Sequence, residues 1–444
     1  MKVAIVGGGI SGLATAFYLE QELPGAEVSL YEAEPFCGGT MQTVERDGFL
    51  FEAGGNGFLS NKPDTLAFMR DSGATPLLLP GNRRARIRFV YDGTLHRLPG
   101  SPLAFLRTGL LSWSGKLRTL GEIRVPARLD DEDESLQQFG YRRVGAEFTD
   151  TFLDAMSAGI FASSPAQLSV GAAFPLVVDL ERKYGGLFRG MMRGRKKGMG
   201  PGGRLMSFVG GVGTLIDHLT AVLDTDIRSG CPVERIEAVD DGFRLTAEGR
   251  DKFFHQVVVA TPAYAAAALL RGLDRELAAR LERIRYSPIA VVGFGYEALD
   301  HPLEGFGLLT TTSARAPVLG ILWDSSVFPN RAPAGKKSLR VMIGGQRNPD
   351  LPARSDEELI ELARRGIRET MGATADPAVT FVKRWPRGIP NYAVGHLDNL
   401  KAVFKRLERW PGLWLNSNAY RGVSMNDCVH NSRRLVERMV QVVS

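Results

Sequence analysis

The glycines near the start of the chain have the spacing best suited to binding a ligand. Gly7, Gly9 and Gly12 form a G-x-G-x-x-G pattern directly after the apolar run VAIV. Such glycines allow a tight strand-to-helix turn and a close backbone approach to a pyrophosphate, which the helix N-terminus attracts. A second strand, predicted at residues 28–31, ends on Glu32, whose carboxylate can accept hydrogen bonds from ribose hydroxyls. The segment therefore predicts a bound dinucleotide rather than a glycine-rich turn without a ligand.

Two further glycine-rich segments follow within the first sixty residues. An enzyme that binds only NAD has no special need for them, whereas the large isoalloxazine ring of a flavin must be approached by backbone over a long track. Each glycine pair alone is typical of an ordinary turn. The three segments in this order favour FAD as the dinucleotide. The glycines concerned are Gly38, Gly39, Gly54, Gly55 and Gly57.

The composition is ordinary for a globular protein with more than one domain core. The chain has 444 residues, of which 44% are hydrophobic and 23% are charged. The net charge is +6, but the cations are spread along the sequence and no nucleic-acid motif accompanies them. We therefore expect no nucleic-acid partner. Anionic small substrates or a phospholipid surface suit this charge better.

Neither the cysteines nor the N-terminus indicates secretion. Cys37, Cys231 and Cys428 are scattered, without a CxxC pattern or a metal-ligand spacing, so we expect reduced structural thiols and no metal. The start of the chain does not resemble a signal peptide, and no apolar run approaches the roughly 18 residues of a membrane-spanning helix. These features predict a cytoplasmic protein and leave open a peripheral contact with the inner face of the cell membrane.

Hydrophobic patterning predicts an α/β protein, α+β overall, with a discontinuous Rossmann-like FAD-binding domain. Strand and helix patterns of the first kind return after a mostly helical insertion. A later stretch is rich in strands, with one helix near residues 356–371, and is typical of a mixed-sheet substrate domain. The predicted limits are 1–98, 205–275 and 396–444 for the FAD-binding domain, 99–204 for the helical insertion and 276–395 for the substrate domain.

A basic stretch lies at the end of the helical insertion. Residues 182–204 contain eight Lys or Arg and no acidic residue, with Met191, Met192 and Met199 among glycines. One interpretation is a loop that is attracted to anionic lipid or to substrate carboxylates. A solvated surface loop is the slightly favoured alternative.

Two blocks near the C-terminus resemble one enzyme family. Residues 413–428 read LWLNSNAYRGVSMNDC and residues 384–397 read RWPRGIPNYAVGHL. Both are similar to motifs of the protoporphyrinogen oxidase family, bacterial type, in the amine-oxidase-like superfamily of FAD enzymes. Further matches are LSVGAAFP, GFGLL and FPNRAP, which begin at Leu168, Gly305 and Phe328. The resemblance covers essentially the whole chain.

The resemblance implies an FAD-dependent oxidation of protoporphyrinogen IX to protoporphyrin IX in haem biosynthesis, with O2 as the electron acceptor. A meso carbon of the macrocycle would give hydride to flavin N5, so the flavin carries the chemistry and no catalytic side chain is identified. Three alternatives stay open: a coproporphyrinogen III oxidase on the same fold, another FAD desaturase or amine oxidase, and a non-catalytic FAD-fold binding module. A homodimer is also open.

The resemblance also implies which residues contact the substrate. Arg88 matches a family arginine that pairs with a propionate, and a bidentate guanidinium suits a carboxylate. Leu309 and Leu322 match two apolar residues that sandwich a pyrrole ring, and Met342 falls where an aromatic contact is usual in some members. The alternative interpretation of Arg88 is that it is one of several neighbouring surface arginines without a ligand. The alternative interpretation of the other three residues is that they pack in the protein core.

A larger set matches the FAD contacts of the family, although Val233 and Trp385 could equally be core residues. Two departures from the family pattern stand out. The loop that reads GPNSF in the family is GGNGF here, ending at Phe58, and the extra glycine raises the entropic cost of ordering it. Ser417 and Ser424 replace glycines, and serine is strained wherever φ is positive. The matching positions are Gly7, Gly8, Gly9, Ile10, Ser11, Gly12, Glu32, Ala33, Thr40, Gly54, Gly55, Asn56, Gly57, Val233, Trp385, Val423, Ser424 and Met425.

Overall fold

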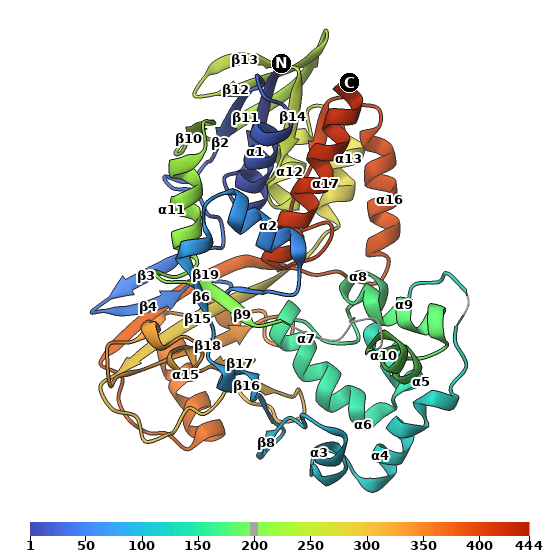
Figure 1. Cartoon of the computed structure of the whole chain (residues 1–444), viewed down its shortest axis with the longest axis vertical. Helices are drawn as coiled ribbons and strands as arrows, with labels where there is room; N and C mark the ends of the chain where they lie inside the picture. The colour runs from blue at the N-terminus through green and yellow to red at the C-terminus, as the bar shows by residue number, and fades with distance from the viewer. Residues whose placement is uncertain (129, 196–202, 444) are drawn as a thin grey trace.

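A five-stranded parallel sheet organises the upper part of the molecule (Figure 1). The computed structural model of the protein describes residues 1–128, 130–195 and 203–443. Every neighbouring pair in this sheet is parallel, and its strands come from three distant parts of the sequence. In spatial order they are β10 (Asp226–Arg228), β2 (Glu27–Tyr31), β1 (Lys2–Val6), β14 (Gln256–Val259) and β20 (Leu413–Leu415).

The two faces of the parallel sheet pack against different layers. Side chains alternate along β1, so Val3 and Ile5 join one core cluster while Ala4 and Val6 join another. The first face is covered by α1 (Ile10–Glu22), α2 (Pro63–Asp71), α11 (Gly213–Val222) and α17 (Met425–Val443). The second is covered by β11 (Val233–Val239), β12 (Gly242–Ala247), β13 (Arg250–Phe254), α12 (Ala263–Leu270), α13 (Arg275–Glu282) and α16 (His396–Leu407). All three cysteines are buried and unpaired, as their spacing predicts.

A seven-stranded mixed sheet forms the lower left part of the molecule (Figure 1). The strand-rich stretch expected from the sequence is confirmed, and so is its helix, α15 (Asp356–Met371), which covers one face. Two strands at residues 89–91 and 95–97 precede the helical insertion in sequence and pair with this sheet. The sheet therefore includes residues of the predicted FAD-binding segment 1–98. In spatial order the strands are β19 (Val379–Pro390), β15 (Tyr286–Tyr296), β18 (Lys337–Gly344), β17 (Gly320–Leu322), β16 (Gly307–Thr310), β7 (Phe89–Tyr91) and β8 (Leu95–Arg97).

The insertion that follows β8 in the sequence is helical, as predicted. Residues 196–202 of its basic stretch lie outside the described residues. None of the described helices is both long and apolar enough to cross a membrane. The helices of the insertion are α3 (Pro102–Arg107), α4 (Trp113–Leu120), α5 (Leu136–Arg143), α6 (Ala146–Phe148), α7 (Asp154–Phe161), α8 (Val170–Ala173), α9 (Pro175–Tyr184) and α10 (Leu187–Arg195).

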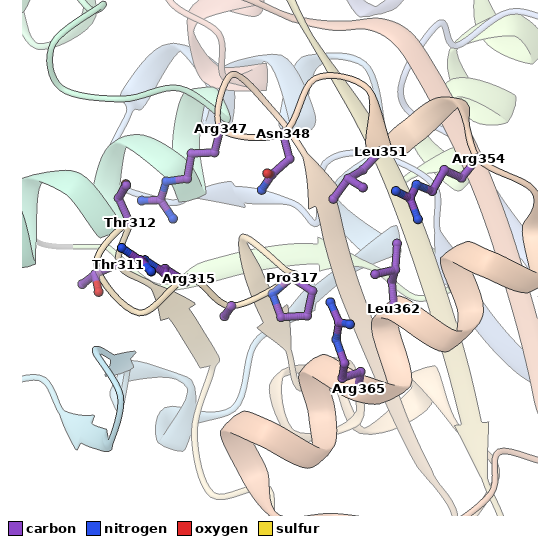
Figure 2. Close-up of a pocket in the computed structure, with 11 residues that line it drawn as sticks. Thr311, Thr312, Arg315, Pro317, Arg347, Asn348, Leu351, Arg354, Leu362 and Arg365 are labelled. Carbon is purple, nitrogen blue, oxygen red and sulfur yellow. The ribbon is translucent and has the colours of Figure 1, made fainter.

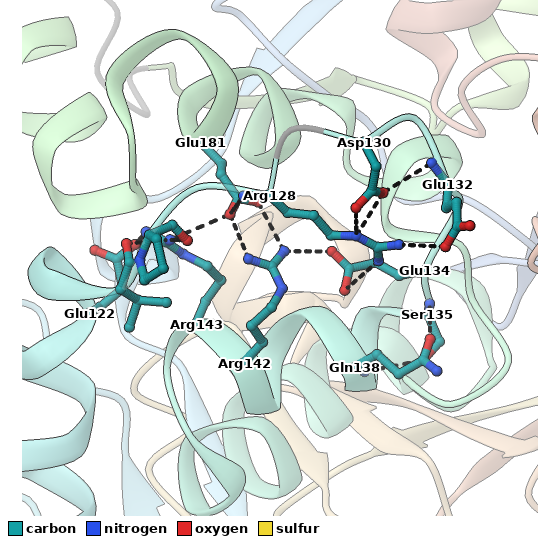
Figure 3. Close-up of polar contacts among 12 residues, drawn as sticks. Glu122, Arg128, Asp130, Glu132, Glu134, Ser135, Gln138, Arg142, Arg143 and Glu181 are labelled. Atoms are coloured by element: carbon teal, nitrogen blue, oxygen red, sulfur yellow. Dashed lines mark hydrogen bonds and ion pairs between the residues drawn. The ribbon is translucent and has the colours of Figure 1, made fainter.

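A buried network of ion pairs holds the insertion together (Figure 3). Arg143 on α5 and Glu122 are both fully buried and form an ion pair. Its neighbour Arg142 lies 2.6 Å from Glu181 on α9 and 2.6 Å from Glu134. Each charge has a partner of opposite sign, which offsets the cost of removing it from water. The network therefore fixes α5 against α9 and the loops that flank them.

Replacing Glu181 with Gln should lower the free energy of unfolding by about 3 kcal/mol at neutral pH, because the buried Arg143 and the half-buried Arg142 lose a counter-charge. Burial by itself raises the pKa of the Glu181 carboxyl. Hydrogen bonds from Arg142 and from the Arg128 N–H outweigh burial, so the pKa lies below its ordinary value of 4.5. The stabilising contribution is therefore complete above that value and is lost as the pH falls through the lower folded pKa.

Urea unfolding at a series of pH values measures both effects. The E181Q variant should be less stable at neutral pH and should lose part of the acid sensitivity of the wild type. Glu132 is a matched control because its carboxylate pairs with Arg128 at 3.0 Å but is 84% exposed. The change to Gln at this position should alter stability by less than about 0.5 kcal/mol. Equal effects of the two variants would contradict the structural role of the buried network.

Candidate functional site

The first glycine turn leaves an open helix N-terminus at the edge of the parallel sheet. Gly7 has φ of +113°, and a Cβ at Gly12 would collide with the Gly7 carbonyl, so both positions require glycine. Gly9 caps α1 without a side-chain hydrogen bond, which leaves the first-turn N–H groups of Ile10 and Ser11 for another partner. Apart from its chain neighbours and the backbone of its own helix, no atom of the described residues lies within 4 Å of a Cβ built on Gly9. The geometry suits an anionic group placed against this helix end.

Glu32, at the end of β2, is fixed by the backbone next to this turn. Its carboxylate accepts the N–H of Gly8 at 2.6 Å and the N–H of Glu34 at 2.9 Å. The Glu32 carbonyl accepts the N–H of Cys231 at 2.8 Å, which brings the start of β11 and the half-buried Val233 close to it. Each carboxylate oxygen keeps a further lone pair for a ligand hydroxyl. Ala33, which follows in the chain, is exposed.

The three glycine segments form one continuous backbone track. The N–H of Gly38 donates to the Gly8 carbonyl at 2.9 Å, and a Cβ on Gly39 would lie 3.6 Å from the Cα of Gly9. Further along, a Cβ on Gly54 would collide with the carbonyl of Thr40. The track therefore runs from the N-terminus of α1 to the loop of residues 53–57, as a long dinucleotide requires.

The far end of the track has the features of a ligand site. Asn56 is half-buried, and neither polar atom of its amide has a hydrogen-bond partner among the described residues. Gly55 beside it has no protein atom within 4 Å of a built Cβ, and Gly57 has φ of +151°. Unpaired buried amide atoms are costly unless a ligand or water binds them. These observations fit an isoalloxazine ring at this loop.

The C-terminal motif approaches the same region at the start of α17. Ser424 donates to Asp427 at 2.5 Å and accepts the Asp427 N–H at 3.2 Å, as a residue before a helix does. Neither Ser417 nor Ser424 has a positive φ, so the two serines that replace family glycines are not strained. Gly422, with φ of +71°, supplies the left-handed residue here, between Val423 and the preceding turn.

Two side chains from the mixed sheet hold the loop at the end of the track. Arg340 on β18 donates to the carbonyls of Glu52 at 2.7 Å and Gly54 at 2.9 Å. Trp385 on β19 donates its indole N–H to the carbonyl of Ala53 at 2.7 Å. Three successive carbonyls are thus bound by the neighbouring domain. Trp385 lies beside the predicted flavin loop, while it also packs on Ile289 in a core cluster.

The predicted substrate residues Leu309, Leu322 and Met342 share one face of the mixed sheet. Leu309 lies opposite Gly320, which lies opposite Met342 on the next strand. Leu322 follows Gly320 by two residues and points the same way. So does Arg340, which reaches the loop of residues 53–57. The structure therefore brings these three half-buried apolar side chains together on the face that carries the loop.

Helix α7 covers the other end of this face. A Cβ on Gly159 would lie 2.8 Å from a methyl group of Leu309, so helix and strand are in close contact. Ala158 and Ala162 pack in the same cluster as Met342. The small residues of α7 thus let the helix approach the sheet, and the apolar face lies between this helix and the glycine loop.

Arg88 lies at the edge of the same sheet, directly before β7. Its guanidinium is exposed and lies 5.4 Å from the ring centroid of Phe306. Val90, two residues along, packs with Leu309 in one cluster. The guanidinium is therefore free to meet a ligand at the rim of the apolar face, but no described contact ties it to the three apolar residues.

Four buried charged residues that support the site escaped the sequence reasoning. Arg340 pairs with Asp324 at 2.8 Å, and Arg331 pairs with Glu52 at 2.9 Å. All four side chains are essentially inaccessible to solvent. A signal was present, because Arg340 interrupts the apolar strand LRVMIGG and Glu52 follows the apolar run FLF. A charge inside an otherwise buried strand needs a partner.

Comparison with known proteins agrees with this geometry. The sequence pattern described as flavin containing amine oxidoreductase matches residues 10–440. The chain belongs to this family. Coproporphyrinogen III oxidase of Bacillus subtilis is 29% identical, covering 98% of this chain and 97% of its own. The chloroplastic protoporphyrinogen oxidase of Oryza sativa is 33% identical, covering 96% of this chain and 86% of its own.

Family membership confirms the resemblance found in the sequence and makes the protein an FAD-dependent oxidoreductase. A solved Exiguobacterium protein, provisionally assigned as a protoporphyrinogen oxidase, superposes with a TM-score of 0.87 and 27% identity, covering 99% of this chain and 98% of that one. The fold class is therefore confirmed. The open N-terminus of α1, the glycine track and the unpaired Asn56 amide all fit the FAD that the family contains.

Replacing Gly9 with Ala should weaken FAD binding at least about tenfold. The φ of Gly9 is −72° and no protein atom crowds the new methyl group, so the fold should tolerate it. The methyl group would instead occupy the space in front of α1. Flavin fluorescence titration of the cofactor-free protein measures the affinity. The control is Gly100→Ala, which also faces open space. Unchanged FAD affinity in G9A would contradict a pyrophosphate at this helix.

Proposed function

We propose that this protein oxidises a porphyrinogen to the corresponding porphyrin, with protoporphyrinogen IX as its substrate and O2 as the acceptor of electrons from the flavin. The observation that carries the proposal is the apolar face of Leu309, Leu322 and Met342 beside the glycine loop. A flat, largely apolar macrocycle suits such a face. The names of the relatives, protoporphyrinogen oxidase and coproporphyrinogen III oxidase, support the same substrate class.

In this proposal the side chains of the chain bind and orient, and FAD supplies a hydride acceptor when bound. Leu309, Leu322 and Met342 hold the macrocycle against the sheet, and α7 covers it and keeps water out. Arg88 binds a propionate at the rim through a bidentate contact. Arg340 and Trp385 fix the loop under the ring, so the rate depends on positioning rather than on an acid or a base.

The cofactor contacts proposed from the family resemblance divide into two ends. The N-terminus of α1, with Glu32, Ala33 and Val233, would bind the adenine, ribose and pyrophosphate part. Thr40, the loop of residues 54–57, Trp385 and the residues 423–425 before α17 would bind the flavin part. The discontinuous domain limits predicted from the sequence are proposed on the same grounds, except that β7 and β8, within the predicted segment 1–98, pair with the mixed sheet.

Coproporphyrinogen III is the second candidate substrate. The Bacillus subtilis relative of that name matches over nearly the full length of both chains. Coproporphyrinogen has four carboxylates where protoporphyrinogen has two, so charges at the rim of the apolar face would discriminate between them. Both candidates share the same chemistry at the flavin.

Anaerobic mixing of the FAD-loaded protein with protoporphyrinogen IX should bleach the flavin absorbance, and air should restore it. The same experiment with coproporphyrinogen III gives the second rate. The larger kcat/KM identifies the substrate, because it reports differential transition-state binding. An unchanged flavin spectrum with both compounds would overturn the proposed function and favour a non-catalytic binding module.

Replacing Arg88 with Ala should raise KM for the porphyrinogen about tenfold with a smaller change in kcat, because a charge-assisted contact to a remote carboxylate is lost. Steady-state kinetics with the preferred porphyrinogen measures this. Arg97 on β8 is the matched control, since it is an exposed arginine of the same hairpin. Equal rises in KM for R88A and R97A would argue for general surface charge instead of a specific contact.

We also infer that the protein rests on an anionic membrane surface through α3 and α4. These helices lie at the end of the molecule opposite both termini (Figure 1). Trp113 and Leu117 on α4 are each 68% exposed, and Leu103 on α3 is also largely exposed. The buried Lys116 ammonium lies 4.6 Å from the centroid of the Trp113 ring and donates to the Leu106 carbonyl, so it holds the exposed ring in place, and an exposed indole suits a lipid headgroup region. The homodimer left open by the sequence stays a prediction.

Co-sedimentation with vesicles tests the membrane contact. The FAD-loaded protein should bind vesicles rich in anionic lipid, and the double change of Trp113 and Leu117 to Ser should reduce the bound fraction several-fold, because exposed apolar side chains drive insertion. Val442 near the C-terminus is equally exposed at 68% and serves as the control in a change to Ser. Equal binding of the two variants would contradict a contact through α4.

A further inference from the structure

A cavity lies at one end of the mixed sheet, away from the glycine track (Figure 2). Its volume is about 490 Å³. Its walls are the loop after β16, the loop after β18 and one side of α15. Leu362 of α15 lines it, together with Pro317 and Leu351 from the two loops.

This cavity is on the opposite face of the sheet from the proposed substrate residues. Leu308 and Val341 alternate with Leu309 and Met342 along their strands, and they pack with Leu359 of α15. The α15 wall of the cavity therefore packs on the sheet face opposite the apolar substrate face. A ligand bound here would not compete directly with the macrocycle.

The lining of the cavity is strongly basic. The described lining residues include Arg315, Arg347, Arg354 and Arg365 and no carboxylate. Figure 2 shows the side chains of Arg347, Arg354 and Arg365 directed toward the space between the loops and α15. Arg315 forms no ion pair with any residue that the structure describes. Arg354 lies 3.6 Å from Glu358, and Arg365 lies 3.6 Å from Glu369. Both glutamate side chains are about half exposed to solvent.

Arg347 is the most buried charged residue in the wall of this cavity. Its side chain is only 10% exposed, and its Nε has no hydrogen-bond partner among the described residues. Asp154 at 2.9 Å is its counter-charge. Burial lowers the pKa of Arg347 in spite of this neighbour. A buried guanidinium in the wall of a cavity is suited to an additional anion.

We propose that this cavity is a second ligand site, and that it binds a small organic or inorganic anion with at least two carboxylate or phosphate groups. Several guanidinium groups from three walls can bind such groups in a bidentate manner, which a single charge would not require. The apolar side chains of Pro317, Leu351 and Leu362 leave room for a short carbon skeleton between the charged groups. The proposal is independent of the porphyrinogen assignment.

Isothermal titration calorimetry of the FAD-loaded protein tests the site. Tricarballylate and pyrophosphate are the two probes, and at least one should bind at one site per chain with Kd below about 1 mM. Tighter binding of the first indicates a polycarboxylate ligand, and tighter binding of the second indicates a phosphorylated one. The absence of saturable binding for both probes up to about ten times that concentration would overturn the proposal.

Substitutions locate the binding. Arg315→Ala and Arg365→Ala should each weaken the better probe about tenfold, since each removes a charge-assisted hydrogen bond. Both side chains are exposed, so the fold should survive, and an unchanged flavin spectrum checks it. Arg364→Ala is the control, because this neighbour on α15 pairs with Asp376 and does not line the cavity. Equal weakening by R364A and R365A would reduce the effect to general surface charge and overturn the proposal.

Discussion

The guanidinium of Arg340 is the contact on which the site depends. It is buried, pairs with Asp324 at 2.8 Å, and binds the carbonyl of Glu52 at the end of β4 (Phe49–Glu52) and the carbonyl of Gly54 in the loop that follows. One side chain thereby joins the glycine-rich loop to the mixed sheet. Without it Asp324 would be an unpaired buried charge, a loss of about 3–5 kcal/mol. In the proposed function, this contact would set the distance between a flavin on the loop and a macrocycle on the sheet.

A second buried pair extends the same connection. The Glu52 carboxylate binds Arg331 at 2.9 Å, the N–H of Val212 and the hydroxyl of Thr43. Burial raises the pKa of Glu52 and lowers the pKa of Arg331, which are the directions that oppose charge in both groups. The pair therefore gains less stability than its short distance suggests. The main effect of the pair is to fix three segments relative to one another, because it connects β4, the turn before α11 and the end of the mixed sheet.

The sequence was most informative where backbone geometry restricts residue type. At Gly7 and Gly12 only glycine fits, so the turn, the strand and α1 could be predicted. Helix α15 could be predicted from its amphipathic pattern and its Ser355 capping box. The contacts of Arg340 with the Glu52 carbonyl and of Arg331 with the Phe208 carbonyl could not, because each joins residues more than a hundred positions apart. The contribution of β7 to the substrate sheet was missed for the same reason, since pairing across an inserted domain leaves no local pattern.

The contacts of Arg340 and Trp385 also explain how this chain tolerates its unusual loop. Where relatives have proline and serine, Gly55 and Gly57 give the unfolded loop more freedom, which costs up to about 1 kcal/mol per residue on ordering. Arg340 and Trp385 bind the three carbonyls directly before these positions. Hydrogen bonds of this kind contribute about 1 kcal/mol each, and those to a charged group contribute more. Side chains of the substrate sheet thus offset the added glycine entropy, so the order of the cofactor loop depends on the neighbouring domain rather than on the loop itself.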